Sequence, residues 1–324
     1  SVYLARQVSQ DRKVALKILP QDLAKDQEFL ERFRREARNA QRLQHNNIVA
    51  AYEMGMVDKY HFIAMEFVDG PNLETVLQKQ GAFNESQLLK LATDIAGALE
   101  AAAVHGVVHR DIKPANVLVT SNGEYKLTDM GLASAAQGDQ RVTMAGFAVG
   151  TPFYISPEQA RGELDVDARA DIYGLGATLY HLATGTLPFP GNNPVVIMTQ
   201  HLQEMPQPPH ERNAAVSKHL SALIMKMMSK DPAERQQNAA ELREDLERCQ
   251  QRLTPTAKIP RLTTSAVTRK QMEQAKARQD AVRSKGLLAR LLPFVPAELR
   301  LAVLAASATL LILALIYMLV KGLK

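Results

Sequence analysis

The sequence predicts an α+β fold of two lobes, a smaller one rich in strands and a larger one rich in helices, followed by one C-terminal transmembrane helix. Three observations predict it. Short segments rich in Val, Leu and Ile lie mainly before residue 70. Longer segments with the helical spacing of apolar residues dominate after that point. Near the C-terminal end, residues 301–320 are uncharged and long enough to span a bilayer, at about 1.5 Å per residue.

The first lobe should contain four strands and one helix. The strands are expected at residues 1–8, 13–19, 48–57 and 60–67, the last two as a hairpin around Val57-Asp58-Lys59. The helix is expected over residues 26–44, with an apolar stripe of Phe29, Phe33, Ala40 and Leu43. Glu36 lies on that same stripe, and a carboxylate on a buried face needs a partner.

The second lobe should be mostly helical. Helices are expected at residues 73–79, 85–105, 157–161, 168–184, 194–203, 215–229 and 238–249. Asn84 is a candidate N-cap for the longest of these helices, and Gly106 lies just past its end. Residues 117–128 are the exception, since they read as two short strands joined at Asn122-Gly123, a dipeptide typical of hairpins.

This hairpin suggests a metal site. In a two-residue turn at Asn122-Gly123, Asn116 and Asp129 would face each other with Cβ atoms about 5 Å apart. An amide oxygen and a carboxylate are hard ligands of the kind that Mg²⁺ takes alongside phosphate oxygens. The pairing depends on the register, because a slip of one residue would remove it.

A second cluster of polar and charged residues precedes the hairpin, in "VVHRDIKPANVL" at residues 107–118. Asp111 and Lys113 alone would ordinarily be a solvated pair. Beside Asn116 and Asp129 they suggest phosphoryl transfer: one carboxylate to accept a hydroxyl proton, one ammonium to neutralise a phosphoryl group, and two metal ligands.

These segments resemble the catalytic and metal loops of the Hanks-type serine/threonine protein kinases of bacteria. Further segments resemble that family in the same order: "VALK" at 14–17, Glu36, "GTPFYISPE" at 150–158, "DIYGLG" at 171–176, and Arg235 as the expected partner of Glu158. The resemblance runs from residue 1 to about residue 247. It implies the two-lobed protein kinase fold, with an N-lobe at 1–68 and a C-lobe at 69–247.

The resemblance also implies roles for individual residues. Asp111 would orient the substrate hydroxyl and accept its proton, and Lys113 would stabilise the γ-phosphoryl group of ATP. Asn116 and Asp129 would hold Mg²⁺, or Mn²⁺ in its place. Lys17 would contact the α- and β-phosphates, and Glu36 would hold Lys17.

The purine of ATP would lie against the linker between the lobes, at residues 65–68. The backbone of Glu66 and Val68 would bond adenine, and Val2, Ala15 and Leu118 would sandwich its ring. For these apolar residues, the alternative is that they belong to the ordinary core.

Other residues bear on substrate type and regulation. Lys113 and Thr151 together are similar to the serine/threonine-specific branch, so the expected partners are proteins with Ser or Thr acceptors. Arg110 resembles the arginine of members that are activated by phosphorylation between the metal loop and Ser156. Thr143 is the preferred acceptor there, ahead of Ser134, although each could be a plain loop residue. A homodimer would allow phosphorylation in trans.

Two features depart from the family pattern. The glycine-rich loop that covers the phosphates is absent, because the sequence starts at Ser1, just before the Val that follows that loop. The expectation is an N-terminal truncation within the loop, and this chain would then bind ATP poorly. The second departure is Met130, which stands where the family has Phe.

The C-terminal part suggests a single-pass membrane protein. Residues 251–300 hold eleven Lys/Arg and three Asp/Glu, whereas the whole chain has a net charge of +5. We therefore expect a basic juxtamembrane linker at 248–298, a transmembrane helix at 299–320, and a short tail at 321–324. The positive-inside rule puts the kinase domain in the cytoplasm, on the inner (plasma) membrane, with lipid as a partner. A buried core helix is the alternative for 301–320.

Three functions are compatible with these observations. The first is an active, membrane-anchored serine/threonine kinase. The second is a pseudokinase that acts as a membrane-anchored binding scaffold, which need not keep all five of Lys17, Glu36, Asp111, Asn116 and Asp129. The third is a protein that binds membranes or nucleic acid through its basic segment. No nucleic-acid partner is expected, because residues 251–300 contain a single aromatic residue, Phe294.

Overall fold

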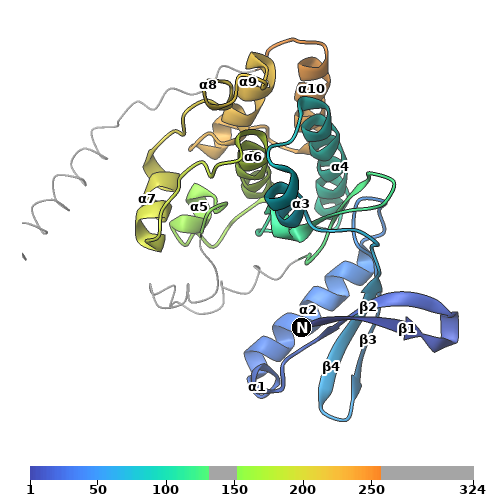
Figure 1. The fold of residues 1–324 in the computed structure, drawn as a ribbon. Coiled ribbons are helices and arrows are strands. Elements are labelled where there is room, and N and C mark those ends of the chain that lie inside the picture. The colour runs from blue at the N-terminus through green and yellow to red at the C-terminus, as the bar shows by residue number, and fades with distance from the viewer. Residues whose placement is uncertain (131–151, 257–324) are drawn as a thin grey trace, which may run out of the picture. The chain divides into compact units, whose positions relative to one another are not determined.

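The computed structural model of the chain describes residues 1–130 and 152–256, apart from the side chains of Glu28, Arg32 and Glu36. All of these residues belong to one compact unit, Ser1–Arg261. A lobe with a four-stranded sheet is followed by a helical lobe with a two-stranded sheet, so the predicted α+β, two-lobed fold is confirmed (Figure 1).

The first lobe is built on an antiparallel sheet with the strand order β1-β2-β4-β3. Its strands are β1 (Val2–Gln7), β2 (Arg12–Ile18), β3 (Ala51–Val57) and β4 (Tyr60–Glu66), and its short helical segments are η1 (Val8–Gln10) and α1 (Gln21–Ala24). The predicted β3–β4 hairpin is confirmed, since Val57 pairs with Tyr60 across a two-residue turn. Asp58 in this turn has a φ of 53°, a conformation that Asp tolerates better than most residues.

Helix α2 (Gln27–Arg42) packs along this sheet and buries one face in the core of the first lobe (Figure 1). Leu30, Phe33 and Ala37 form the buried face, at the spacing of three and four residues that a helix requires. The predicted stripe is wrong at Phe29, which is 38% exposed. The buried face runs through the next residue, Leu30, which lies about 100° further round the helix.

The second lobe is mainly helical. Its helices are α3 (Leu73–Gln80), α4 (Glu85–Val104), α5 (Pro157–Ala160), α6 (Ala168–Thr184), α7 (Pro194–Gln203), α8 (Pro209–Arg212), α9 (Lys218–Met227) and α10 (Ala239–Gln250), with short 3₁₀ segments η2 (Pro114–Asn116) and η4 (Pro232–Glu234). The predicted N-cap of α4 is confirmed, because the Asn84 side chain accepts from the backbone N–H of Gln87 at 3.0 Å. Gly106 follows that helix with a φ of 66°.

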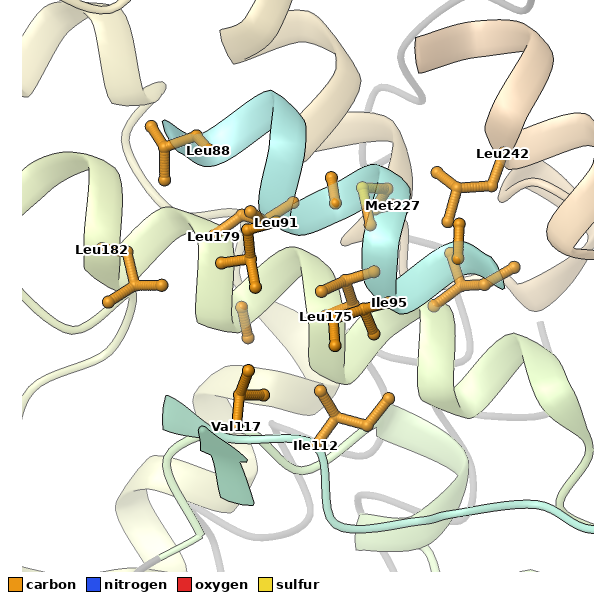
Figure 2. Close-up of a cluster of buried hydrophobic side chains, with 14 of the residues drawn as sticks. Leu88, Leu91, Ile95, Ile112, Val117, Leu175, Leu179, Leu182, Met227 and Leu242 are labelled. Carbon is orange, nitrogen blue, oxygen red and sulfur yellow. The ribbon is translucent and has the colours of Figure 1, made fainter. Parts of the chain in front are cut away.

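Helices α4 and α6 form the centre of this lobe and share one apolar core (Figure 2). Leu91 and Ile95 of α4 meet Leu175 and Leu179 of α6 there, and all four are fully buried. Ile112 points into the same cluster from the loop that follows α4 (Figure 2). The loop of the predicted catalytic residues is therefore anchored in the buried core of the lobe through Ile112.

The hairpin of β5 (Val117–Val119) and β6 (Tyr125–Leu127) has a different register from the predicted one. Its loop is closed by Thr120, whose N–H bonds the carbonyl of Glu124 and whose carbonyl accepts from Gly123. Three residues thus form the loop, and Gly123 takes the left-handed position with a φ of 77°. The prediction of a two-residue turn at Asn122-Gly123 is wrong.

The altered register changes the neighbours of the predicted metal ligands. Val117 pairs with Leu127, so Asn116 lies opposite Thr128 and not opposite Asp129. The carbonyl of Asn116 accepts from the N–H of Thr128 at 3.0 Å. The predicted Asn116–Asp129 pairing is therefore wrong. Asn116 directly precedes β5, and Asp129 follows Thr128 at the end of β6.

Within residues 1–130 and 152–256, no helix is both long enough and apolar enough to cross a bilayer. The helix predicted at 299–320 lies outside the described residues, as does the linker from residue 257 onward.

Candidate functional site

The predicted catalytic residues Asp111, Lys113 and Asn116 form one hydrogen-bonded set. The carboxylate oxygen Oδ2 of Asp111 accepts from Nζ of Lys113 at 2.7 Å and from Nδ2 of Asn116 at 2.9 Å. The same amide nitrogen of Asn116 donates to the Asp111 carbonyl at 2.8 Å. Asp111 and Lys113 are each partly exposed, whereas Asn116 is buried. A substrate could therefore reach Asp111 and Lys113, while Asn116 holds Asp111 from the buried side.

The loop that carries this set is held by Asp171, near the start of α6. Its carboxylate accepts from the backbone N–H groups of His109 at 2.8 Å and Arg110 at 2.6 Å. Burial raises the pKa of Asp171, and these donors together with nearby His109 and Arg110 oppose that rise. The resemblance of "DIYGLG" to a helix that anchors the catalytic loop is borne out at this contact. Arg110 is held with a φ of 67°, in a conformation that costs free energy.

His109 also joins the loop to the end of strand β6. Its Nε2 lies 2.8 Å from the carbonyl of Thr128, and its Nδ1 accepts from the backbone N–H of Asp111 at 3.2 Å. A carbonyl only accepts, so the proton is on Nε2 and the ring is in one defined tautomer. His109 is the first residue of the "HRD" motif, the one signal in the sequence that could have pointed to this role.

Asp129 and Lys17 form the second half of the site. Nζ of Lys17, on strand β2, lies 2.7 Å from Oδ1 of Asp129, and both side chains are largely buried. Asp129 has a φ of 61°, so its backbone is left-handed and no longer extended as in the strand that precedes it. Glu36 lies in α2, but its side chain is outside the described part of the chain, so the Lys17–Glu36 pair stays a prediction.

Met130 follows Asp129 and is 2% exposed. It belongs to the core cluster of the second lobe together with Leu43 and Ile48, which come from the segment after α2. A long, flexible thioether can fill such a site where an aromatic ring would otherwise lie.

The residues predicted to surround the purine do not all behave alike. Ala15, Val68 and Leu118 are partly buried, and each of them packs against the core of the first lobe. Val2 is 60% exposed and is not part of that cluster.

The linker between the lobes is fastened by the side chain of Glu66, through contacts that no motif in the sequence predicts. Its carboxylate lies 2.8 Å from Nζ of Lys126 on β6 and also accepts from the N–H of Ala50 at 3.3 Å. The N–H of Glu66 donates to the carbonyl of Ala50 at 2.8 Å. A ligand could therefore bond the Glu66 backbone only through its carbonyl oxygen.

A buried ion pair holds the segment that leads into α5. The guanidinium of Arg235 donates to both carboxylate oxygens of Glu158, at 2.6 and 2.8 Å, and the expected pair is confirmed. Ser156 caps α5, and Nε2 of Gln159 donates to the carbonyl of Arg110 at 2.7 Å. Residues 156–159 are thus fixed to the catalytic loop.

The predicted regulatory residues are only partly described. The guanidinium of Arg110 is half-buried, burial lowers its pKa, and nearby Arg35 adds to that effect while Asp171 opposes it. Within the part of the chain that the structure describes, Nε of Arg110 is buried without a hydrogen-bond partner. Thr143, Thr151 and Ser134 lie outside the described residues.

Comparisons with known proteins agree with this geometry. The protein kinase domain family matches residues 1–245. Serine/threonine-protein kinase PknB of Mycolicibacterium smegmatis is 42% identical over 270 residues, which are 82% of this chain and 43% of that protein. PknB of Mycobacterium leprae is 41% identical over 269 residues, with the same shares of 82% and 43%. The crystal structure of the Mycobacterium tuberculosis PknI kinase domain is similar with a TM-score of 0.59 and 29% identity, over 76% of this chain and 90% of that one. The chain spans less than half the length of the curated relatives it matches.

Proposed function

The chain belongs to the protein kinase family and carries a kinase domain of the serine/threonine type, and on that premise we propose that the protein transfers the γ-phosphoryl group of ATP to Ser and Thr hydroxyls of other proteins. The observation that carries the proposal is the hydrogen-bonded set of Asp111, Lys113 and Asn116. Asp111 would accept the proton of the substrate hydroxyl, and Lys113 would neutralise charge on the transferring phosphoryl group.

The metal is proposed to be Mg²⁺, held by Asn116 and Asp129. Nδ2 of Asn116 is engaged by Asp111, so the remaining polar atom of the amide is an oxygen, a hard donor. Among the described residues, no three His, Cys, Asp or Glu side chains are grouped as a site made wholly of protein ligands would be. One carboxylate and one amide fit Mg²⁺, which usually keeps waters and phosphate oxygens as its other ligands, and Mn²⁺ could replace it.

The nucleotide is proposed to bind with its phosphates at Lys17 and its base against the linker. The partial burial of Ala15, Val68 and Leu118 in one cluster supports a contact with the purine. Val2 has weaker support because it is mostly exposed. Glu36 is proposed to hold Lys17.

Regulation by phosphorylation is proposed from Arg110. Its buried Nε lacks a partner within the described residues, and an unsatisfied guanidinium nitrogen is suited to receive a phosphate. Thr143 is the proposed acceptor, modified in trans by a second copy of the chain, and Thr151 is proposed to orient Asp111 and Lys113.

The proposed location is the inner membrane, with the kinase domain in the cytoplasm. The support is the uncharged stretch at 301–320 and the basic segment before it.

The activity is tested by transfer of ³²P from ATP to a general protein substrate. Asp111→Asn should reduce transfer at least about a hundredfold while nucleotide binding persists. Asp58→Asn is the matched control, because Asp58 lies in the exposed turn between β3 and β4, and this variant should retain full activity. An Asp111→Asn variant that transfers phosphate near the parent rate would overturn the assignment, and an inactive parent chain would favour the binding scaffold.

A further inference from the structure

A buried chain of hydrogen bonds joins Lys230 to the backbone carbonyl of Phe153. Nζ of Lys230 lies 3.0 Å from Oη of Tyr173, which lies 2.8 Å from Nδ1 of His201. Nε2 of His201 lies 3.0 Å from the Phe153 carbonyl. Tyr173 and His201 are fully buried, on α6 and α7 respectively, and α7 packs beside α5 (Figure 1).

The direction of these bonds follows from their last acceptor. A carbonyl only accepts, so Nε2 of His201 must carry a proton and donate it to Phe153. Burial, together with the charge of Lys230, lowers the pKa of His201 to about 3, so the ring is neutral and its Nδ1 accepts. Tyr173 therefore donates to His201 and accepts from Lys230, and each hydrogen bond has one defined direction.

The surroundings of Lys230 give this chain of hydrogen bonds a free-energy cost, because they bury its ammonium group. Its ammonium lies 4.8 Å from the ring centre of Phe189 and 5.3 Å from that of Tyr173. Burial lowers its pKa to about 7, with Arg235 adding to the effect and Glu204 opposing it. Apolar side chains of the same volume would pack without that cost, so the polar chain indicates a requirement beyond packing.

The chain of hydrogen bonds ends at Phe153, beside the predicted catalytic loop. The hydroxyl of Tyr154, next to Phe153, bonds Nδ1 of His181 on α6 at 2.8 Å. A Cβ on Gly174 would lie 3.4 Å from the carbonyl of Ile112 and 3.6 Å from that of Tyr154, so both carbonyls approach the same point of α6. Ile112 separates Asp111 from Lys113, and residues 153–154 are therefore placed against the loop where a substrate hydroxyl would arrive.

We propose that His201 and Tyr173 are positioning residues, which fix the backbone at Phe153 as part of the surface that receives the protein substrate. Lys230 completes the chain by orienting the Tyr173 hydroxyl. This inference rests on the proposed kinase activity and deepens it, because it names the buried side chains that hold the backbone at Phe153 in place. Loss of the hydrogen bonds should weaken peptide binding and leave ATP binding unchanged.

The test uses Tyr173→Phe, which removes one hydroxyl and keeps the ring, and His201→Leu, which removes the donor to Phe153. Tyr180→Phe is the matched control, because Tyr180 is also a buried residue of α6 and its hydroxyl also donates to a backbone carbonyl, that of Gln207 at 2.9 Å. His201→Gln restores an N–H donor near the position of Nε2. The substrate is the best acceptor from an arrayed library of Ser and Thr peptides, and melting curves report whether each variant is folded.

For Tyr173→Phe and His201→Leu, we expect the KM for peptide to rise at least about fivefold, with the KM for ATP unchanged. Tyr180→Phe should match the parent, and His201→Gln should recover most of the loss. Equal peptide KM values in the parent, Tyr173→Phe and His201→Leu would overturn this inference alone. A rise in both KM values, or an equal effect in Tyr180→Phe, would show a merely structural role and also overturn it. A parent chain that phosphorylates no peptide of the library would contradict the proposed function itself.

Discussion

The ammonium group of Lys17 lies 2.7 Å from a carboxylate oxygen of Asp129, and this contact links strand β2 of the first lobe to the end of the hairpin in the second. The two residues are 112 positions apart in the sequence. The contact brings a cation suited to phosphate oxygens next to a carboxylate suited to a metal. The proposed phosphate contact and the proposed metal ligand therefore lie side by side.

The first prediction concerns Lys17. Lys17→Met should lower kcat/KM for phosphate transfer at least about a hundredfold, because removing one oriented charge that stabilises the transferring group typically costs that much. Melting curves should show that the variant remains folded. Lys13→Met is the matched control on the same strand, since Lys13 is exposed, and it should keep its activity. If Lys17→Met simply unfolds, Lys17 is a structural residue.

The second prediction concerns the buried pair of Glu158 and Arg235. Glu158→Gln should lower the free energy of unfolding by about 3 kcal/mol, because it leaves the Arg235 charge buried without a counter-ion. Glu163→Gln, in the exposed pair with Arg161, should change it by less than about 1 kcal/mol. Urea unfolding measures both values, and similar effects in the two variants would contradict the prediction.

The third prediction is a pH dependence of stability from Asp245. Burial alone would raise its pKa, but hydrogen bonds from Lys226, Thr256 and Gln236 outweigh that effect and hold the pKa below its usual value. The unfolded chain then takes up the proton first as the pH falls. The stabilisation from Asp245 should be fully present above the ordinary Asp pKa, about 4, and be lost as the pH falls through the lower folded value.

Urea unfolding of the parent and of Asp245→Asn between pH 6 and pH 3 checks this dependence. The difference in the free energy of unfolding should be largest at pH 6 and should shrink toward pH 3. A difference that stays constant over this interval would show that the folded carboxyl group titrates as it does in the unfolded chain.

The fourth prediction tests the three-residue loop between β5 and β6. Gly123→Ala should destabilise the protein by about 1 kcal/mol, because Gly123 has a φ of 77° and an added Cβ would meet no atom within 4 Å, so the cost lies in the backbone. Asn122→Ala should be nearly neutral, since Asn122 is not among the described residues with positive φ. A two-residue turn would require positive φ at both positions, and both substitutions would then be costly.

The fifth prediction concerns the proposed membrane anchor. In cell fractionation, the chain of residues 1–324 should sediment with membranes and stay there after an alkaline carbonate wash. A shortened chain of residues 1–250 should be in the supernatant. Release of the longer chain by the wash would indicate that the basic segment binds the surface electrostatically and that residues 299–320 do not span the bilayer.

Local sequence signals predicted most of the fold. The hairpin at Asp58, the N-cap at Asn84 and the long helices were expected within a few residues, because each depends on spacing or turn chemistry that lies within one segment. Phe29 and the hairpin at Gly123 were predicted wrongly for a related reason. In both cases the local pattern allowed two arrangements one residue apart, and packing against distant segments chose between them.

The candidate site was predictable to the extent that it lies in short motifs. The set of Asp111, Lys113 and Asn116 lies within six residues of the chain, and its members do meet. The contacts of Glu66 with Lys126 and of His201 with Phe153 join residues 60 and 48 positions apart. No periodicity or spacing relates such polar partners, so they could be found only in the folded chain.

The positive φ of Asp129 narrows the substitutions that this position can accept. A replacement must tolerate a left-handed backbone as well as present an oxygen, and Asn and Asp are among the few residues with a side chain that do so. Glu, although it keeps the charge, would carry a backbone penalty that Asn would not. During evolution, a chain that loses activity here through Asn or Gly could therefore keep its fold, so an inactive but stable relative is a single substitution away.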